Sequence, residues 1–315
     1  MPAANPALSL GFIGLGVMGA PMAGHLARAG HRLSLLDADP ARTRAVAAEL
    51  GATAMATPAE VAAASDIVIS MLPNGGVVQQ VALGTPGRDD GLIHGLRPGA
   101  LLLDCSSAEP WLTEATAKAL AARGARMVDA PVSGAAWGAA EGNLVFMAGG
   151  DAADLARVRP LLDLMGRAVF HLGGLGSGHA MKCINNLITA LTFSATAEGL
   201  VIGKRYGLDP AAMVDVLNES TGQSWITQNH IRQRILSRSF DDPFKLALML
   251  KDMGIANALA RETGSAAPMA GLGQQLWQAA SRAAGPEASV SELVRWVEQL
   301  SGTPVTPGAG PRQGG

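Results

Sequence analysis

Several features that would define other classes of protein are scarce in this sequence. Its 315 residues contain only two cysteines, Cys105 and Cys183, which are too few for a disulfide framework. The six histidines are scattered, and no group of cysteine and histidine residues has the spacing of metal ligands. The sequence therefore predicts neither a fold held together by disulfides nor a metal site.

Charge is also sparse, and neither sign dominates. Charged residues make up 16% of the chain, and the formal net charge is −2 without any basic run. A protein that binds mainly nucleic acid usually carries a basic patch, so we expect no nucleic-acid partner.

No segment has the pattern of a membrane or export signal. Residues 1–7 lack a charged stretch followed by an apolar one, so no secretory signal is expected. The most helix-like apolar stretch, 183–197, has 15 residues and includes Asn185 and Asn186. A membrane span needs about 20 apolar residues. We therefore expect a buried helix here, no membrane partner and a cytoplasmic protein.

Apolar residues and glycine, by contrast, are plentiful. Apolar residues make up 48% of the chain, and the 39 glycines suit tight junctions between helices and strands. Short apolar runs in the first half alternate with helical patterns such as 20–29, 40–50 and 58–64. This alternation predicts an α/β, Rossmann-type doubly wound sheet, which binds ligands at the carboxyl ends of its strands. The expected strands are 8–13, 32–37, 67–72, 101–104, 126–129 and 144–148.

Around residue 176 the pattern changes to helix alone. Residues 178–205 contain no proline and predict one helix of about 28 residues, apolar on most faces. We expect a Rossmann domain at 8–174 and an all-α C-terminal domain at 175–300, joined by this long interdomain helix. The glycine- and proline-rich tail, 301–315, is expected to be disordered. Further helices are expected at 210–218, 225–235, 246–262, 273–284 and 290–299.

The turn after the first expected strand has the pattern Gly-x-Gly-x-x-Gly. Gly14 permits a tight turn, Gly16 lets a pyrophosphate approach the backbone, and Gly19 lets helix and strand pack closely. The helix that follows offers unpaired N–H groups and the positive end of its dipole to phosphates. The pattern predicts a dinucleotide site formed by Gly14, Leu15, Gly16, Val17, Met18 and Gly19.

Asp37 ends the second expected strand, at the distance from the glycine turn that suits a ribose contact. A carboxylate there accepts hydrogen bonds from the ribose hydroxyls of NAD and repels the 2′-phosphate of NADP. Arg42 is five residues further on. We therefore expect NAD rather than NADP. The alternative is that Asp37 or Asp39 caps the helix after Pro40.

Two further turns follow expected strands, where a cofactor would pass. Leu72 and Pro73 follow the third strand, and Ser106 follows the fourth. From their local chemistry alone, ordinary turn or capping residues are an equal alternative. After the fifth strand, Ser133 and Gly134 place a hydroxyl beside exposed backbone N–H groups, which suits a carboxylate. A plain loop is the alternative for that segment.

Lys182 and Asn186 lie four residues apart near the start of the long helix and so share one face. Apolar neighbours would desolvate the lysine and make its neutral form accessible, as a general acid/base requires. A surface lysine with a solvated head is the alternative. Lys251 and Asp252 lie in another apolar helix, either as a solvated pair or with the lysine toward an anion or a nicotinamide.

Together these motifs resemble the β-hydroxyacid dehydrogenase family, which includes 3-hydroxyisobutyrate dehydrogenase and tartronate semialdehyde reductase. The resemblance covers about residues 8–300. It implies that Lys182 is catalytic, that Asn186 helps hold the substrate oxygen, and that Ser133 and Gly134 bind the substrate carboxylate. It also implies that Lys251, the Leu72-Pro73 turn and the Ser106-Ser107 segment lie near the cofactor, and that the chain forms a homodimer or homotetramer. The matching segments are 14–19, 129–134, 176–186 and 251–252.

One position departs from the family pattern. The family usually has two glycines after the motif serine, whereas Ala135 follows Gly134 here, with Trp137 shortly after. We expect Ala135 to contact the substrate and to influence its preferred size. The expected activity is reversible hydride transfer between NAD(P) and a small 3-hydroxy acid similar to 3-hydroxyisobutyrate. The alternatives are a semialdehyde reductase that works mainly in the reductive direction and a non-catalytic NAD-binding sensor.

Overall fold

The computed structural model of the chain describes residues 7–309 and consists of two compact units. They divide between Lys182 and Cys183, later than the expected boundary at 174/175. The reason is that the first turns of the long helix bind to strand ends of the first unit, as described below. Each unit is described by itself.

The first unit is built on a six-stranded sheet with the order β3-β2-β1-β4-β5-β6, in which every strand pair is parallel. The strand order reverses between β1 and β4, so the sheet is doubly wound, which confirms the predicted Rossmann-type fold. The register aligns the carboxyl ends, with Ile13 beside Leu36 and Ser70 beside Asp104. The strands are β1 Ser9–Ile13, β2 Arg32–Leu36, β3 Thr53–Ala54, β4 Ile67–Ser70, β5 Leu101–Asp104 and β6 Arg126–Asp129.

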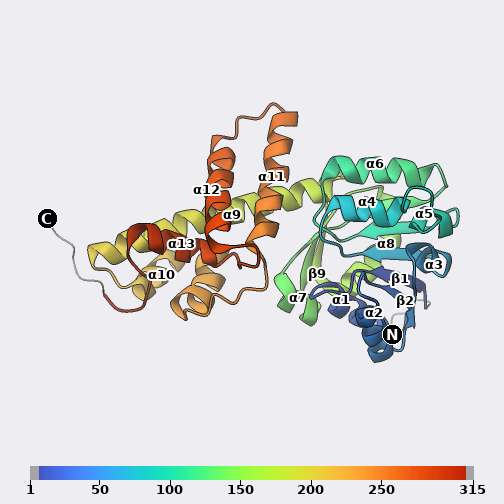
Figure 1. The fold of residues 1–315 in the computed structure, drawn as a ribbon, viewed down its shortest axis with the longest axis horizontal. Helices are drawn as coiled ribbons and strands as arrows, with labels where there is room; N and C mark the ends of the chain where they lie inside the picture. Colours follow the sequence, from blue (N-terminus) through green and yellow to red (C-terminus); the bar gives the residue numbers. More distant parts are fainter. Residues whose placement is uncertain (1–6, 310–315) are drawn as a thin grey trace. The chain divides into compact units, whose positions relative to one another are not determined.

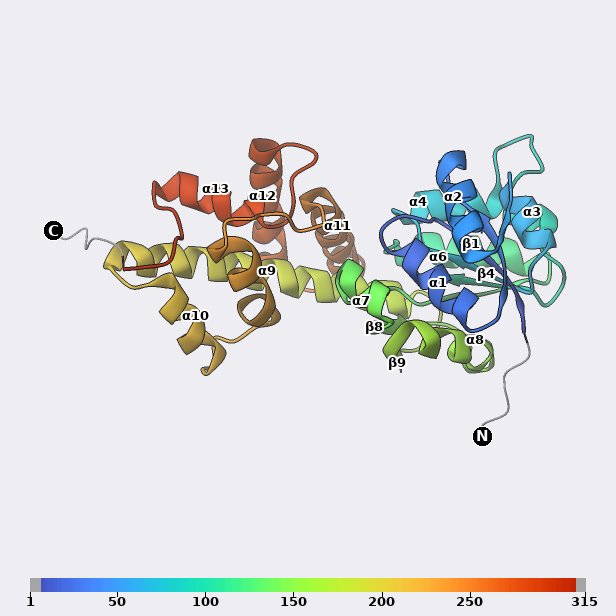
Figure 2. The ribbon, with the colours of Figure 1, turned by 90° about the horizontal axis from the view of Figure 1, so that it is seen from below.

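Both faces of this sheet are covered, because alternate side chains of the strands point to opposite sides. Leu10 and Phe12 of β1 pack in one core with residues of α1 and α8, whereas Ile13 packs in another with residues of α3, α4 and α6. The two layers of helices are visible in Figures 1 and 2. The helices are α1 Gly19–Arg28, α2 Pro40–Leu50, α3 Pro58–Ala63, α4 Gly75–Leu83, α5 Leu92–Gly95, α6 Pro110–Ala121, α7 Ala135–Glu141 and α8 Ala152–Met165.

A second, smaller sheet has the order β7-β8-β9 and comprises Val132–Ser133, Leu144–Ala148 and Gly166–His171. The expected strand at 144–148 lies here rather than in the large sheet, and it pairs with β7 in antiparallel register. The strands β3, β7 and β9 were not predicted. The first two have only two residues each, and β9 has no buried residue, so none shows the apolar run that marks a core strand.

Among its described residues the second unit has helices and no strand, as predicted, apart from one isolated bridge between Lys245 and Ser289. α9 (Ser177–Tyr206) supplies the central part of its core through Phe193, Ala197 and Leu200, against Trp277 of α12. The expected helix at 225–235 is a π-helix, Ile226–Leu236, and α12 begins earlier than expected. The other helices are α10 Pro210–Asn218, α11 Leu246–Glu262, α12 Pro268–Ala284 and α13 Glu292–Ser301.

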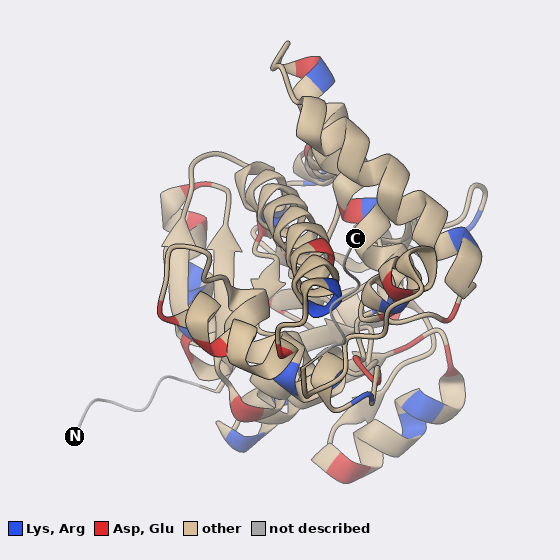
Figure 3. Cartoon of the chain, turned by 90° about the vertical axis from the view of Figure 1, so that its left-hand side faces the viewer, with Lys and Arg blue, Asp and Glu red and all other residues tan. Residues whose placement is uncertain are grey.

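Among the described residues, α9 alone is long and apolar enough to cross a membrane. Its most apolar window has a mean hydropathy of 1.2 and is 39% buried. Some of the apolar side chains of α9, among them Phe193, Ala197 and Leu200, belong to the core of the second unit. Figure 3 shows lysine and arginine interspersed with aspartate and glutamate over the elements in view.

The tail expected to be disordered is ordered at 302–309. Val305 is buried and its N–H donates to Glu298 Oε1 at 2.7 Å. Lys204 Nζ donates to the carbonyl oxygen of Thr306 at 3.0 Å. Composition alone predicted disorder. The buried side chain of Val305 and the hydrogen bond to the carbonyl of Thr306 instead hold this segment in the second unit. Residues 310–315 lie outside the described residues.

Candidate active site

The glycine turn links β1 to α1 and has the geometry that its three glycines predict. Gly14 has a φ of +95°, and a Cβ there would lie 2.3 Å from the carbonyl oxygen of Met71. A Cβ at Gly19 would lie 1.8 Å from the carbonyl oxygen of Gly14, so helix and strand touch at this point. A Cβ at Gly16 would meet nothing within 4 Å. The turn is therefore closed toward the protein at two glycines and open at the third, which fits a pyrophosphate against its backbone.

Asp37 lies directly after β2 and holds the glycine turn. Its Oδ2 accepts from the N–H of Leu15 at 2.7 Å, and its Oδ1 accepts from the N–H of Asp39 at 2.9 Å. Asp39, not Asp37, caps α2 by accepting from the N–H of Ala41 at 2.9 Å. Arg42, five residues along the chain, lies 3.5 Å from Asp37 Oδ1. The carboxylate of Asp37 therefore has a cation beside it, a contact that sequence spacing alone did not establish.

The turns after β4 and β5 are joined to each other. The N–H of Leu72 donates to Ser106 Oγ at 2.9 Å. The N–H of Ser106 and the hydroxyl of Ser70 both donate to Asp104 Oδ1, at 3.1 and 2.8 Å. Asp104 is fully buried. The structure thus joins Leu72 to Ser106 at neighbouring strand ends, and Asp104 in turn holds Ser106. Pro73 comes one residue later, before Asn74, which caps α4.

Ser133 ends the short strand β7, and the two residues after it have unusual backbone conformations. Gly134 has a φ of +138° and Ala135 a φ of +55°. The second value lies in the left-handed region, which costs a residue with a Cβ about 1 kcal/mol. Ala135 therefore occupies a conformation that suits glycine, and Trp137 of α7 is 47% exposed.

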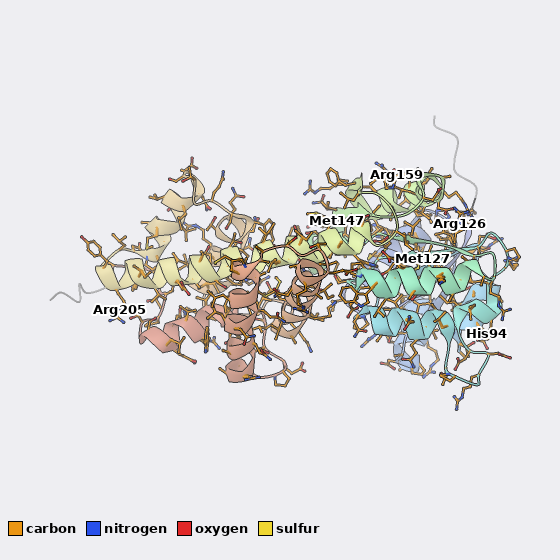
Figure 4. All side chains as sticks on the ribbon, turned by 90° about the horizontal axis from the view of Figure 1, so that it is seen from above. His94, Arg126, Met127, Met147, Arg159 and Arg205 are labelled. Atoms are coloured by element: carbon orange, nitrogen blue, oxygen red, sulfur yellow. The ribbon has the colours of Figure 1, made fainter. Side chains whose placement is uncertain are left out.

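A buried polar network that sequence analysis did not anticipate surrounds the start of α9. Asp129, the last residue of β6, accepts from the N–H of Gly176 at 2.8 Å and from the N–H of His179 at 2.9 Å. His179 is fully buried, and its Nδ1 lies 2.7 Å from Thr113 Oγ1. Gly178 has no room for a Cβ, which would lie 2.1 Å from the carbonyl oxygen of Met147, labelled in Figure 4. The sequence signal that could have revealed this network is His179, a histidine inside the motif that contains Lys182.

Lys182 is half-buried, and Asn186 follows one turn later and is buried. Asn186 Nδ2 donates to Asp252 Oδ2 at 2.6 Å, across 66 residues of sequence. Asp252 is buried and pairs with Lys251, whose Nζ lies 3.0 Å from Asp252 Oδ1. The second unit therefore brings Asn186 and Lys251 together around one carboxylate. Sequence analysis marked Asp252 only as a neighbour of Lys251.

Two observations limit which other chemistry is available. Burial, with a smaller contribution from Asp104, raises the pKa of the Cys105 thiol well above its usual value, so this thiol is inert. Within residues 7–309, no group of three or more histidine, cysteine, aspartate or glutamate residues could hold a metal ion. A surface hollow of about 640 Å³ beside α4 includes none of the predicted site residues.

The fold and the glycine turn together define a class: a protein with a Rossmann-type dinucleotide-binding domain and a helical second unit. Residues 9–173 match the family described as the NAD-binding domain of 6-phosphogluconate dehydrogenase. Residues 176–297 match the family described as NAD-binding of NADP-dependent 3-hydroxyisobutyrate dehydrogenase.

Individual relatives agree with these matches. The chain is 37% identical to 3-hydroxyisobutyrate dehydrogenase of Pseudomonas aeruginosa, over 85% of this chain and 90% of the relative. It is 35% identical to 2-(hydroxymethyl)glutarate dehydrogenase of Eubacterium barkeri, over 96% of this chain and 98% of the relative. A solved structure of Mycobacterium tuberculosis 3-hydroxyisobutyrate dehydrogenase with L-serine has a TM-score of 0.84 and 31% identity, over 92% of this chain and 99% of that one.

The chain belongs to the β-hydroxyacid dehydrogenase family. It is an NAD(P)-dependent oxidoreductase that acts on CH–OH groups, as the motifs predicted.

Proposed function

We propose that the enzyme reversibly oxidises the primary hydroxyl of a small 3-hydroxy acid, HO–CH₂–CH(R)–CO₂⁻, to the corresponding aldehyde. The names of the relatives support this substrate class. 3-Hydroxyisobutyrate, 2-(hydroxymethyl)glutarate and L-serine, the molecule in the solved structure, all contain this unit and differ only in R. The constant part is the carboxylate and the hydroxymethyl group, so those are the parts the site would recognise. We favour a small apolar R, as in 3-hydroxyisobutyrate.

Lys182 is the proposed general acid/base. Its neutral amine takes the proton of the substrate hydroxyl as the C–H bond breaks, and its ammonium returns the proton in the reverse direction. When bound, the nicotinamide supplies the acceptor for the hydride. The observation that carries this role is the position of Lys182: half-buried on α9, with the helix start held by Asp129.

Asn186 and the β7 turn are the proposed substrate-binding groups. Asn186 is one helical turn from Lys182, and the bond to Asp252 fixes the orientation of its amide. It would hold the substrate oxygen beside the lysine. The Ser133 hydroxyl and the backbone of Gly134 and Ala135 would bind the carboxylate, as a hydroxyl and backbone N–H groups can do.

The proposed cofactor is NAD rather than NADP. The carboxylate of Asp37 has about four acceptor positions, of which two receive N–H groups of Leu15 and Asp39. The remaining capacity suits ribose hydroxyls. Arg42 is the competing influence, because it could receive a 2′-phosphate. We expect the ratio of kcat/KM for NAD over NADP to exceed one, and a ratio below one would refute the preference.

Other proposed cofactor contacts are Gly14, Leu15, Gly16, Val17, Met18, Gly19, Leu72, Pro73, Ser106 and Lys251.

The proposed assembly is a homodimer or homotetramer in the cytoplasm. Large apolar side chains of α9 remain exposed in the single chain, among them Ile184, Ile188 and Ile202. A second copy of the chain would remove such a surface from water. Light scattering on the purified protein tests this, and a monomer at micromolar concentration would contradict it.

The central test is Lys182→Ala, assayed by NADH absorbance with a panel of 3-hydroxy acids. Turnover should fall about a hundredfold or more, the usual size of a general acid/base contribution, while NADH still binds. Lys118→Ala is the matched control, because Lys118 is exposed on α6 and outside the proposed site. Near-normal turnover of Lys182→Ala would overturn the assignment. Failure of the unmodified protein with every acid, despite NAD binding, would favour the sensor alternative.

A further inference from the structure

We propose that His179 is a positioning residue that couples the cofactor-side turns to the helix carrying Lys182. The proposal rests on the proposed role of Lys182. Lys182 follows His179 by three residues, which corresponds to about 4.5 Å along the axis of α9. A displacement of this helix start would therefore displace Lys182, and an error of about 1 Å in a catalytic group can cost a hundredfold in rate.

The helix start is held from the outside by strand ends. Helix N-termini expose N–H groups that need acceptors. For α9 the carboxylate of Asp129 supplies two acceptors, one oxygen to Gly176 and the other to His179. The acceptor comes from β6, 47 and 50 residues earlier in the chain, so it ties the helix to the sheet. Asp129 fixes the backbone at this point, and its Oδ2 also lies 3.8 Å from Nδ1 of the His179 imidazole.

The imidazole of His179 lies near the end of a second strand, β5. Its Nδ1 lies 2.7 Å from Thr113 Oγ1 of α6, and its Nε2 lies 3.5 Å from Asp104 Oδ2. His179 Nε2 and Asp104 Oδ2 are both buried and have no hydrogen-bond partner. A buried polar atom without a partner is energetically costly, so the two facing atoms gain from moving closer.

The other oxygen of Asp104 leads to the cofactor side. Asp104 Oδ1 accepts from the N–H of Ser106, and Ser106 Oγ accepts from the N–H of Leu72. Leu72 and Ser106 are proposed cofactor contacts. A continuous series of backbone and side-chain contacts therefore runs from those turns through Asp104 and His179 to the first turns of α9. We infer that the contact between His179 and Asp104 helps to set the position of Lys182.

The chain contains a matched control. His230 in the second unit is also buried between a hydroxyl and a carboxylate, with Nε2 2.9 Å from Ser291 Oγ and Nδ1 3.3 Å from Asp242 Oδ2. Its ring contacts Ser291, Asp242, Phe193 and Trp225, none of which is a proposed site residue. Its replacement therefore imposes a similar structural loss without affecting the series that leads to Lys182.

The experiment compares His179→Leu, His179→Gln and His230→Leu in the full-length protein. Glutamine can place an N–H near the position of Nε2, whereas leucine cannot donate at all. We expect His179→Leu to lower kcat at least tenfold with KM for NAD changed less than threefold. His179→Gln should recover most of kcat, and His230→Leu should leave kcat within twofold. Equal kcat losses in His179→Leu and His230→Leu, or no recovery with glutamine, would overturn the proposal.

A second measurement does not depend on turnover. Lysine acylation by a neutral ester, read by peptide mass spectrometry, should change at Lys182 when NADH is added, with Lys118 as the internal reference. In His179→Leu this response should be lost although NADH still binds by fluorescence. An unchanged response in His179→Leu, or none in the unmodified protein, would contradict the coupling. If His179→Leu fails to fold, Thr113→Val serves instead, because it removes the hydroxyl beside Nδ1 together with that hydroxyl's bond to the carbonyl oxygen of Glu109. Full activity of Lys182→Ala would instead refute the proposed catalytic role while leaving this labelling result interpretable.

Discussion

The two units position their polar side chains in different ways. In the first unit, most of the proposed cofactor contacts lie in short turns after parallel strands, and neighbouring turns meet because the carboxyl ends of the strands align. In the second unit, Asn186 and Lys251 come from helices far apart in sequence and meet at a buried carboxylate, Asp252. The first arrangement follows from local backbone geometry, whereas the second depends on helix packing. Substitutions should therefore act through backbone strain in the first unit and through unpaired buried groups in the second.

The largest effect is expected at the glycine turn. Gly19→Ala should destabilise the protein by about 3 kcal/mol or more, because its Cβ would clash with the carbonyl oxygen of Gly14 and backbone cannot move aside cheaply. Gly16→Ala is the matched control for stability, since its Cβ meets no protein atom within 4 Å. It should weaken NADH binding about tenfold or more while urea unfolding stays unchanged. Equal losses of stability in both variants would contradict this account of the turn.

The next effect is expected at Asp252. Asp252→Ala leaves the amide of Asn186 and the ammonium of Lys251 without their shared carboxylate, and breaking a buried pair usually costs about 3 kcal/mol. Urea unfolding measures this loss, and kcat should fall as well. Asp215→Ala, which breaks the exposed pair with Arg232, should leave the free energy of unfolding nearly unchanged. A small effect at Asp252 would show that packing, not the carboxylate, holds these helices.

A pH effect of moderate size is expected from His230. Burial is the largest influence and lowers the pKa of His230, with Asp242 opposing and Arg234 adding to the shift. Above the unfolded pKa of about 6.5 both states are neutral and stability is unaffected. As the pH falls below that value the unfolded chain binds a proton first, so stability decreases until the folded pKa is reached.

Thermal unfolding between pH 7.5 and 5 measures this dependence. In His230→Phe the slope of the unfolding temperature against pH should be reduced. The pH dependence that remains includes a contribution from His31, whose pKa is also lowered by burial. A slope that is unchanged in His230→Phe would show that other groups carry the dependence.

The smallest effect is expected at Ala135. Ala135→Gly relieves the left-handed conformation and should stabilise the protein by up to about 1 kcal/mol, partly offset by the greater flexibility of the unfolded chain. Ala136→Gly, one residue later in α7, should be destabilising instead. A loss of stability in Ala135→Gly would mean that the methyl group packs favourably. A change in KM among 3-hydroxy acids in the same variant would link this position to substrate size.

Much of the first unit was predictable because its signals are local. Apolar runs predicted six strands, and each of these is buried and has at least four residues in the structure. One of them, 144–148, belongs to the smaller sheet. The glycine spacing predicted which glycine is open and which two are closed. The same reasoning missed β9, which is exposed, and misjudged residues 302–309, where the buried side chain of Val305 outweighs a composition typical of disorder.

The sequence by itself determined the parallel sheet, the glycine turn, the long helix and the family, because each depends on periodicity or spacing within a short window. Only the tertiary structure decided the partners of buried polar groups: Arg42 beside Asp37, Asp252 between Asn186 and Lys251, and His179 between Thr113 and Asp104. Three of these five contacts join residues 66 to 75 positions apart, and the other two depend on the direction that a side chain takes. Hydrogen bonding in the interior is a property of the packed chain, and no local pattern encodes it.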